Sequence, residues 1–92
     1  MEDIIQLGGN IQLNGFSELD GATMVVLKKV IGNYAKQFNE KCSKFEKLII
    51  KLNEGTFNAE VINEGNSIIS EAKDNNLFFA VDKALKEIEN KI

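Results

Sequence analysis

The side chains of this sequence that are best suited to bind a ligand are lysines, and they are unevenly distributed. The segment from Lys28 to Lys51 holds seven lysines and two acidic residues, which gives it a local charge of +5. The rest of the 92-residue chain holds four lysines and twelve acidic residues, so it carries −8 and the whole chain −3. Clustered lysines can neutralise phosphates, as nucleic-acid-binding surfaces do. The other interpretation is two oppositely charged surfaces that keep the protein in solution.

The sequence contains few of the side chains that catalysis commonly uses. The sequence contains no histidine, and its only cysteine is Cys42. A zinc site of nitrogen and sulfur ligands is therefore excluded, as is a Ser–His or Cys–His catalytic pair. Gly8-Gly9-Asn10 lacks the Lys-Ser/Thr of a P-loop, so we interpret it as a bend. We expect a non-enzymatic protein without a cofactor or small-molecule substrate, in which Cys42 is a helix-terminal or small core residue.

Alternating apolar residues near the start of the chain indicate a strand with one buried face. These apolar residues are all odd-numbered: Ile5, Leu7, Ile11 and Leu13. Gly8-Gly9 lies in the middle of the pattern and either bends one strand or turns a small hairpin. A helix is expected next, because apolar residues recur at helical spacing. They are Met24, Leu27, Val30, Ile31, Tyr34 and Phe38.

The second half of the chain predicts three strands and a helix. Apolar residues alternate in Phe45–Leu52, Phe57–Val61 and Ile68–Ala72, and the short turns between these segments require an antiparallel meander. Asp74 or Asn75 then caps a final helix with an apolar stripe. The order β-α-β-β-β-α predicts one α+β domain over all 92 residues. We expect a two-layer sandwich, with a four-stranded sheet and both helices on one face.

Two groups of side chains face outward from the predicted helices. The first helix carries three lysines away from its apolar stripe: Lys28, Lys29 and Lys36. On the second helix, Phe79 lies roughly opposite the stripe, and Lys83 and Lys86 follow it at helical spacing. Such a phenylalanine could stack on a base while the lysines meet phosphates. It could also flank the core, form a dimer contact or be a single exposed apolar residue.

The sequence also predicts where the protein works. The chain begins Met1-Glu2-Asp3, which is acidic where a signal peptide needs a basic start. No apolar run approaches the length needed to span a bilayer. A single cysteine allows no internal disulfide, which suits the reducing cytosol. We therefore expect a cytoplasmic protein with no membrane partner.

Two stretches of the sequence resemble a known family. "GGNIQLNG" (residues 8–15) is similar to the opening strand of the hibernation-promoting factor, or protein Y, family. "SEAKDNNLFFAVDKALKEIENKI" (residues 70–92) is similar to that family's last strand and helix, most closely at Val81-Asp82 and Ala84-Leu85. The predicted element order also resembles the family's, and the likeness extends over essentially the whole chain. The length corresponds to the short form of these factors.

The resemblance implies a ribosome-associated function. Members of the family are not enzymes; they bind the small ribosomal subunit along the mRNA and tRNA path and hold ribosomes inactive in starvation or stress. Basic side chains of the helices and the nearby sheet edge meet rRNA phosphates. By position, the implied RNA-binding residues are Lys28, Lys29, Lys36, Lys73, Lys83 and Lys86.

Two other functions are compatible with the same order of elements. The first is a protein-interaction or homodimeric α+β module without RNA binding, which Phe79 and the acidic surplus suggest. The second is a double-stranded-RNA-binding domain, whose α-β-β-β-α core is similar. That domain has a basic cluster at the start of its second helix, and "DNNLFFA" (residues 74–80) has none.

Overall fold

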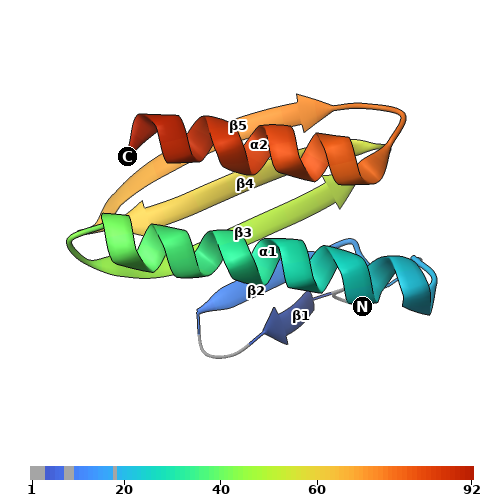
Figure 1. Cartoon of the computed structure of the whole chain (residues 1–92), viewed down its shortest axis with the longest axis horizontal. Coiled ribbons are helices and arrows are strands. Elements are labelled where there is room, and N and C mark those ends of the chain that lie inside the picture. The colour runs from blue at the N-terminus through green and yellow to red at the C-terminus, as the bar shows by residue number, and fades with distance from the viewer. Residues whose placement is uncertain (1–3, 8–9, 18) are drawn as a thin grey trace.

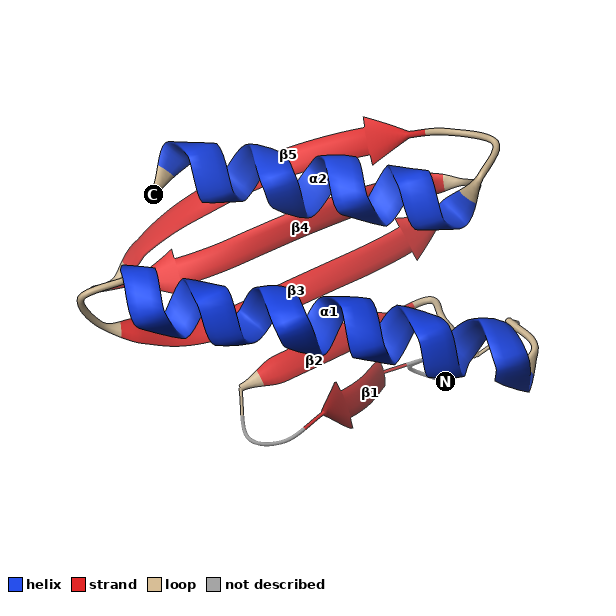
Figure 2. Ribbon diagram, viewed as in Figure 1, coloured by secondary structure: helices blue, strands red, loops and turns tan. Residues whose placement is uncertain are grey.

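The computed structural model describes residues 4–7, 10–17 and 19–92, which form one mixed sheet and two helices. Figure 2 distinguishes the helices and the strands by colour. The elements are β1 (Ile4–Leu7), β2 (Ile11–Asn14), α1 (Gly21–Lys41), β3 (Phe45–Asn53), β4 (Thr56–Asn63), β5 (Asn66–Lys73) and α2 (Leu77–Lys91). In space the strands follow their order in the chain, β1-β2-β3-β4-β5. In the view of Figure 1 both helices lie in front of the sheet, and their N-terminal ends are at the same side.

The sheet has five strands, so the prediction of four was wrong. The odd-numbered apolar residues belong to two short antiparallel strands, in which Ile5 pairs with Leu13 and Leu7 with Ile11. Cross-strand partners point to the same face of a sheet, so a hairpin keeps the odd-numbered pattern that one strand would show. Gly8-Gly9, which we expected to form a bend or turn, lies outside the described residues.

β2 and β3 are parallel, and α1 forms the connection between them. The three strands β3, β4 and β5 form the antiparallel meander that the alternating pattern predicted. Each of its turns places a Glu-Gly pair at positive φ, Glu54-Gly55 and Glu64-Gly65. Two successive residues at positive φ are typical of the tight hairpin turn that matches the twist of the strands, and glycine adopts this conformation at low cost.

The core lies between the sheet and the helices. Leu48 and Ile50 of β3 and Phe57 of β4 are completely buried. The remaining large side chains without exposed surface come from β2, the loop after it, the two helices and β4: Leu13, Phe16, Leu27, Ile31, Phe38, Val61, Val81, Leu85 and Ile88. Phe16 and Phe57 meet edge to face, with ring centroids 5.8 Å apart, which is a favourable aromatic geometry.

Close packing after β2 and a side-chain cap before α2 fix the ends of these elements. Gly15, after β2, has φ +82, and a Cβ atom added there would collide with the carbonyl oxygen of Leu52. Asn76 caps α2, because its Oδ1 accepts hydrogen bonds from the backbone N–H of Phe78 and Phe79. The prediction of Asp74 or Asn75 as the cap was therefore wrong. Asp74 instead accepts from the N–H of Asn76 at 2.9 Å and shapes the turn before the helix.

Candidate nucleic-acid interface

The outer face of α1 carries a group of exposed lysines. Lys28, Lys29 and Lys36 are exposed, because the opposite side of the helix is fixed to the core by Leu27 and Phe38. Within the described part of the chain, none of the three lysines forms an ion pair. Lys29 and Lys36 are one heptad apart, so about 10 Å of helix axis separates them. Three unpaired ammonium groups are therefore available to an anionic partner.

The lysines of α2 have a different environment. The Nζ atom of Lys83 lies 2.9 Å from Oδ2 of Asp74 and donates a hydrogen bond to it. The backbone N–H of Asn76, and after it Lys83, hold the pKa of Asp74 below its usual value. Lys86 is exposed and forms no ion pair among the described residues. Of the two predicted lysines on α2, one is therefore already paired with a carboxylate.

Lys73 lies on the other side of the sheet. Ser70 is the buried residue of β5, and its Oγ atom donates a hydrogen bond of 2.5 Å to the carbonyl oxygen of Ala84 in α2. Because side chains alternate along a strand, Lys73 points away from the helices. The structure therefore does not bring Lys73 together with the lysines of α1 and α2.

Acidic residues line the contact between the two helices. The hydroxyl of Tyr34 donates a hydrogen bond of 2.6 Å to Oδ1 of Asp82, and Lys41 lies 3.9 Å from Glu89. Burial, and after it the hydrogen bond to Asp82, raises the pKa of Tyr34 above its ordinary value. Both contacts join residues 48 positions apart, so the helices run in the same direction. Asp82 and Glu89 thus lie between the two groups of predicted lysines.

Phe79 is one of several exposed apolar side chains near the N-terminal ends of the helices. It is 62% exposed, which contradicts the interpretation that it flanks the core. Phe78 is 37% exposed, and Val25 and Val26 of α1 are also exposed. The sequence analysis did not single out these three residues. Val25 could have been found, because at ~100° per residue it lies almost opposite Leu27.

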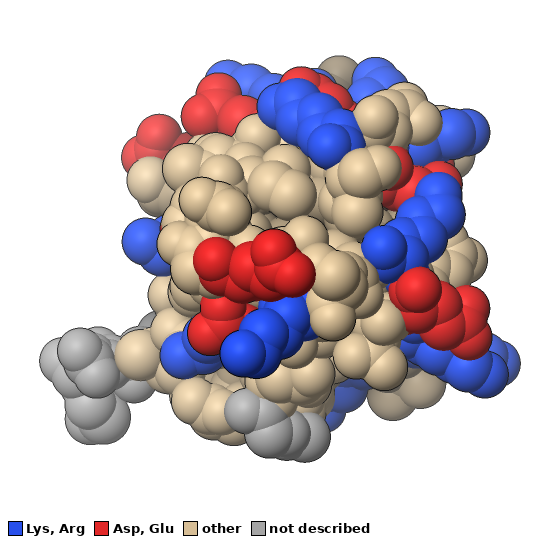
Figure 3. Space-filling view, turned by 90° about the vertical axis from the view of Figure 1, so that its left-hand side faces the viewer, with Lys and Arg blue, Asp and Glu red and all other residues tan. Residues whose placement is uncertain are grey.

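Charges of both signs mix at the end of the molecule where α1 and α2 finish. Figure 3 shows this end, with lysines and acidic residues next to one another. Lys91 contributes to the mixture, because its Nζ atom lies 3.2 Å from Glu87 and donates to the carbonyl oxygen of Ile69. This end is therefore less suited to a polyanion than the outer face of α1.

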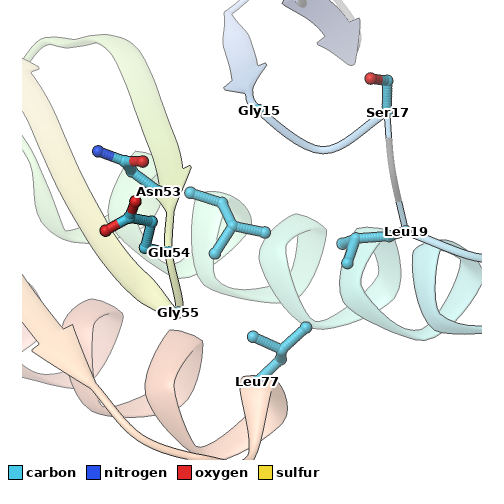
Figure 4. A pocket seen from close by; sticks show the side chains of 8 residues that line it. Gly15, Ser17, Leu19, Asn53, Glu54, Gly55 and Leu77 are labelled. Carbon is cyan, nitrogen blue, oxygen red and sulfur yellow. The ribbon is translucent and has the colours of Figure 1, made fainter.

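A hollow of about 530 Å³ lies at the opposite end, between the β3–β4 turn and the N-terminal ends of the helices. Figure 4 shows Leu19 and Leu77 pointing into it. Its polar lining includes Asn53, Glu54 and Ser17. Among the described lining residues Glu54 is the only titratable side chain, and one carboxylate alone does not form an acid–base pair. The hollow thus has the character of a gap between loops.

Cys42 is both the C-terminal cap residue of α1 and part of the core. Burial raises the pKa of its thiol, which lowers its reactivity as a nucleophile. The described residues include no group of three or more acidic or cysteine side chains that could hold a metal ion. None of the described helices has the length and apolar character to cross a membrane.

Comparison with known proteins gives no family for this chain. No protein-family model matches it, and no curated protein is significantly similar to it. The resemblance to the hibernation-promoting factors therefore stays a prediction that rests on the sequence.

Proposed function

We propose that this protein is a non-enzymatic, cytoplasmic ribosome-associated factor that binds rRNA of the small subunit and inhibits translation under stress. The observation that carries the proposal is the outer face of α1, where Lys28, Lys29 and Lys36 are exposed and unpaired within the described chain. The element order of the chain resembles that of the hibernation factors, and two stretches of its sequence are similar to theirs.

The charge of α1 suits a phosphate backbone. Each lysine that meets a phosphate releases a condensed counterion, which favours binding at low salt. Contacts of this kind need no particular base sequence, because phosphates position a protein without specifying a sequence. Lys86 and Phe79 form a second group on α2, separated from the α1 lysines by Asp82 and Glu89, and there the exposed ring could stack on an unpaired base. Lys83 would first have to leave Asp74, and Lys73 lies on the opposite side of the sheet.

Co-sedimentation with purified small ribosomal subunits in a low-salt sucrose gradient tests this function. We expect the wild-type chain to migrate with the subunits and the triple variant K28A/K29A/K36A to stay at the top. The matched control is K44A/K47A/K51A, which removes three lysines of the same +5 segment but none from α1, and should still migrate with the subunits. A wild-type chain that stays at the top at low salt, or equal losses in both variants, would contradict the proposal.

A protein-interaction module is the second candidate, and the exposure of Phe79 favours it. Two substitutions separate the roles of this ring. Phe79→Leu keeps an apolar side chain but removes the aromatic face, whereas Phe79→Ala removes both. Loss of RNA binding in both variants indicates base stacking, while loss of self-association in light scattering of Phe79→Ala alone indicates an apolar protein contact. Unchanged behaviour of both variants in both assays would exclude a role for Phe79.

A further inference from the structure

Gly32 lies well inside α1, where a glycine is unfavourable. The helix has 21 residues, and Gly32 is in neither its first nor its last turn. Glycine is less stable than alanine inside a helix, because it loses more backbone entropy on folding. The adjacent residues Val25 and Val26 are also weak helix formers, since they are β-branched. Gly32 therefore adds to the cost of a helix that already has a weak local propensity.

Nothing in the described part of the chain requires a glycine at this position. Gly32 is not among the described glycines at positive φ, so its backbone conformation suits other residues. It is exposed, and a Cβ atom added there meets nothing within 4 Å. Gly15 is different, because it has φ +82 and an added Cβ atom would collide with the carbonyl oxygen of Leu52. The space beside Gly32 is therefore open to a partner.

Three lysines surround this space. Lys28 and Lys29 precede Gly32 by four and three residues, and Lys36 follows it by four, so all three are its neighbours on the helix surface. At ~100° per residue they lie within about 60° of Gly32 around the helix axis. Glu40, the only acidic residue of α1, is about 12 Å further along the axis. Gly32 is thus at the centre of the unpaired positive charge of α1.

The direction of helical side chains shows what glycine leaves open. Side chains on a helix lean toward its N-terminal end, so each covers the turn before its own Cα atom. A side chain at position 32 would therefore cover the turn that holds Lys28 and Lys29. Lys36 leans toward Gly32 from the other side. Glycine leaves the helix surface between Lys36 and the other two lysines uncovered.

We infer that Gly32 is the point at which α1 approaches a phosphate of the bound RNA most closely. The inference rests on the proposed binding of rRNA and adds a positioning residue that has no charge of its own. A phosphate that lies against the helix at Gly32 has lysines on both sides. The compact ammonium group and flexible stem of lysine suit such contacts.

A side chain at position 32 would hold the phosphate away from the helix. The attraction between a phosphate and an ammonium group weakens as their distance grows and as water enters between them. A larger residue should therefore weaken RNA binding, although the same residue favours the helix. Affinity and stability are expected to change in opposite directions at this position.

A series of neutral substitutions tests the inference. Gly32→Ala and Gly32→Leu should be at least as stable as the wild type in urea denaturation, because alanine and leucine are strong helix formers. Affinity is measured at low salt for purified small ribosomal subunits and for fluorescein-labelled poly(U), since phosphate contacts need no particular sequence. It should fall in the order glycine, alanine, leucine. We expect Gly32→Leu to raise the Kd about tenfold, the effect of losing one charge-assisted contact.

Gly21→Ala and Gly21→Leu are the matched controls. Gly21 is also an exposed residue of α1, and an added Cβ atom there also meets nothing within 4 Å. It precedes Lys28 by seven residues, about 10 Å along the axis, so a side chain there does not cover the lysines. Both control variants should bind like the wild type.

Equal affinity of Gly32→Leu and the wild type, or equal losses in the Gly21 and Gly32 variants, would overturn the inference. If Gly32→Leu is less stable than the wild type, Gly32→Ala decides the question. A wild-type chain that binds poly(U) but not the subunits, with the loss in Gly32→Leu retained, would contradict the proposed function and support this inference. A wild-type chain that binds neither RNA would overturn both.

Discussion

The two helices of this protein share one core but differ in how they use their outer faces. α1 carries four lysines and one glutamate, whereas α2 carries three lysines and three acidic residues. The three outward lysines of α1 have no carboxylate partner among the described residues, but Lys83 and Lys91 of α2 are both ion-paired. Cationic side chains therefore form a binding surface only where the fold leaves them unpaired.

The helices also differ in how they are fixed. α2 is capped by Asn76. The carbonyl oxygen of Ala84 in α2 also accepts a hydrogen bond from the buried hydroxyl of Ser70. In α1 the contact of the Asp20 carboxyl is mainly with the side chain of Thr23, which holds the pKa of Asp20 below its usual value, and no hydrogen bond of good capping geometry forms. Gly32 lies in the middle of this helix. We interpret α2 as the helix that secures the fold and α1 as the helix that meets the partner.

The largest effect on stability is expected from filling the space between α2 and β5. Ala84 is 1% exposed and lies against Ser70, so Ala84→Leu should lower the free energy of unfolding by about 1–3 kcal/mol through overpacking. Urea denaturation followed by circular dichroism measures the change. Lys86→Leu, on the exposed side of the same helix, is the control and should shift the midpoint little. Equal stability of Ala84→Leu and the wild type would contradict close packing of α2 on the sheet.

A smaller effect of opposite sign is expected in α1. Gly32 is exposed, and a Cβ atom added there meets nothing within 4 Å. Gly32→Ala should therefore raise the free energy of unfolding by up to about 1 kcal/mol, because alanine loses less backbone entropy in a helix. The same denaturation experiment measures it. A loss of stability would show that α1 needs the flexibility or the space that glycine provides.

The smallest effect concerns the contact between the helices and depends on pH. The pKa of Tyr34 is raised in the folded protein above the ordinary value of 10.0, so the folded state keeps this proton longer than the unfolded chain. The contribution of Tyr34 to the free energy of unfolding is therefore fully present below pH 10 and is lost as the pH rises through the raised pKa. The wild type should therefore lose more stability above pH 10 than Tyr34→Phe does. Identical alkaline profiles would contradict the raised pKa of Tyr34, which burial and, after it, the hydrogen bond to Asp82 produce.

Much of the fold could be predicted from the spacing of apolar residues. The meander follows from the alternation in β3, β4 and β5, and both helices follow from their apolar stripes. The fifth strand was left open between two alternatives, because Ile5 and Leu13 have the same parity in one bent strand and in a hairpin; the pairing of β1 with β2 confirms the hairpin. The α2 cap was missed because three neighbouring residues, Asp74, Asn75 and Asn76, have side chains able to cap a helix.

The candidate site was predicted only in part. Helical spacing was sufficient to place Lys28, Lys29 and Lys36 on an outer face. The pairing of Lys83 with Asp74 depends on the conformation of the turn before α2. The spacing of residues along a helix does not predict that conformation. The position of Lys73 was predictable, since the parity of Ile68, Ser70 and Ala72 already assigns it to the opposite face.

The salt dependence of binding to small ribosomal subunits tests the central claim most directly, since it counts phosphate contacts on each helix. We predict that K28A/K29A/K36A reduces the slope of log Kobs against log salt concentration by about 2–3, at ~0.7–0.9 per lost contact. K83A/K86A should reduce it by about 1 or less, because Lys83 is already paired with Asp74. Equal reductions in the two variants, or a larger one from α2, would contradict the assignment of α1 as the RNA-binding helix.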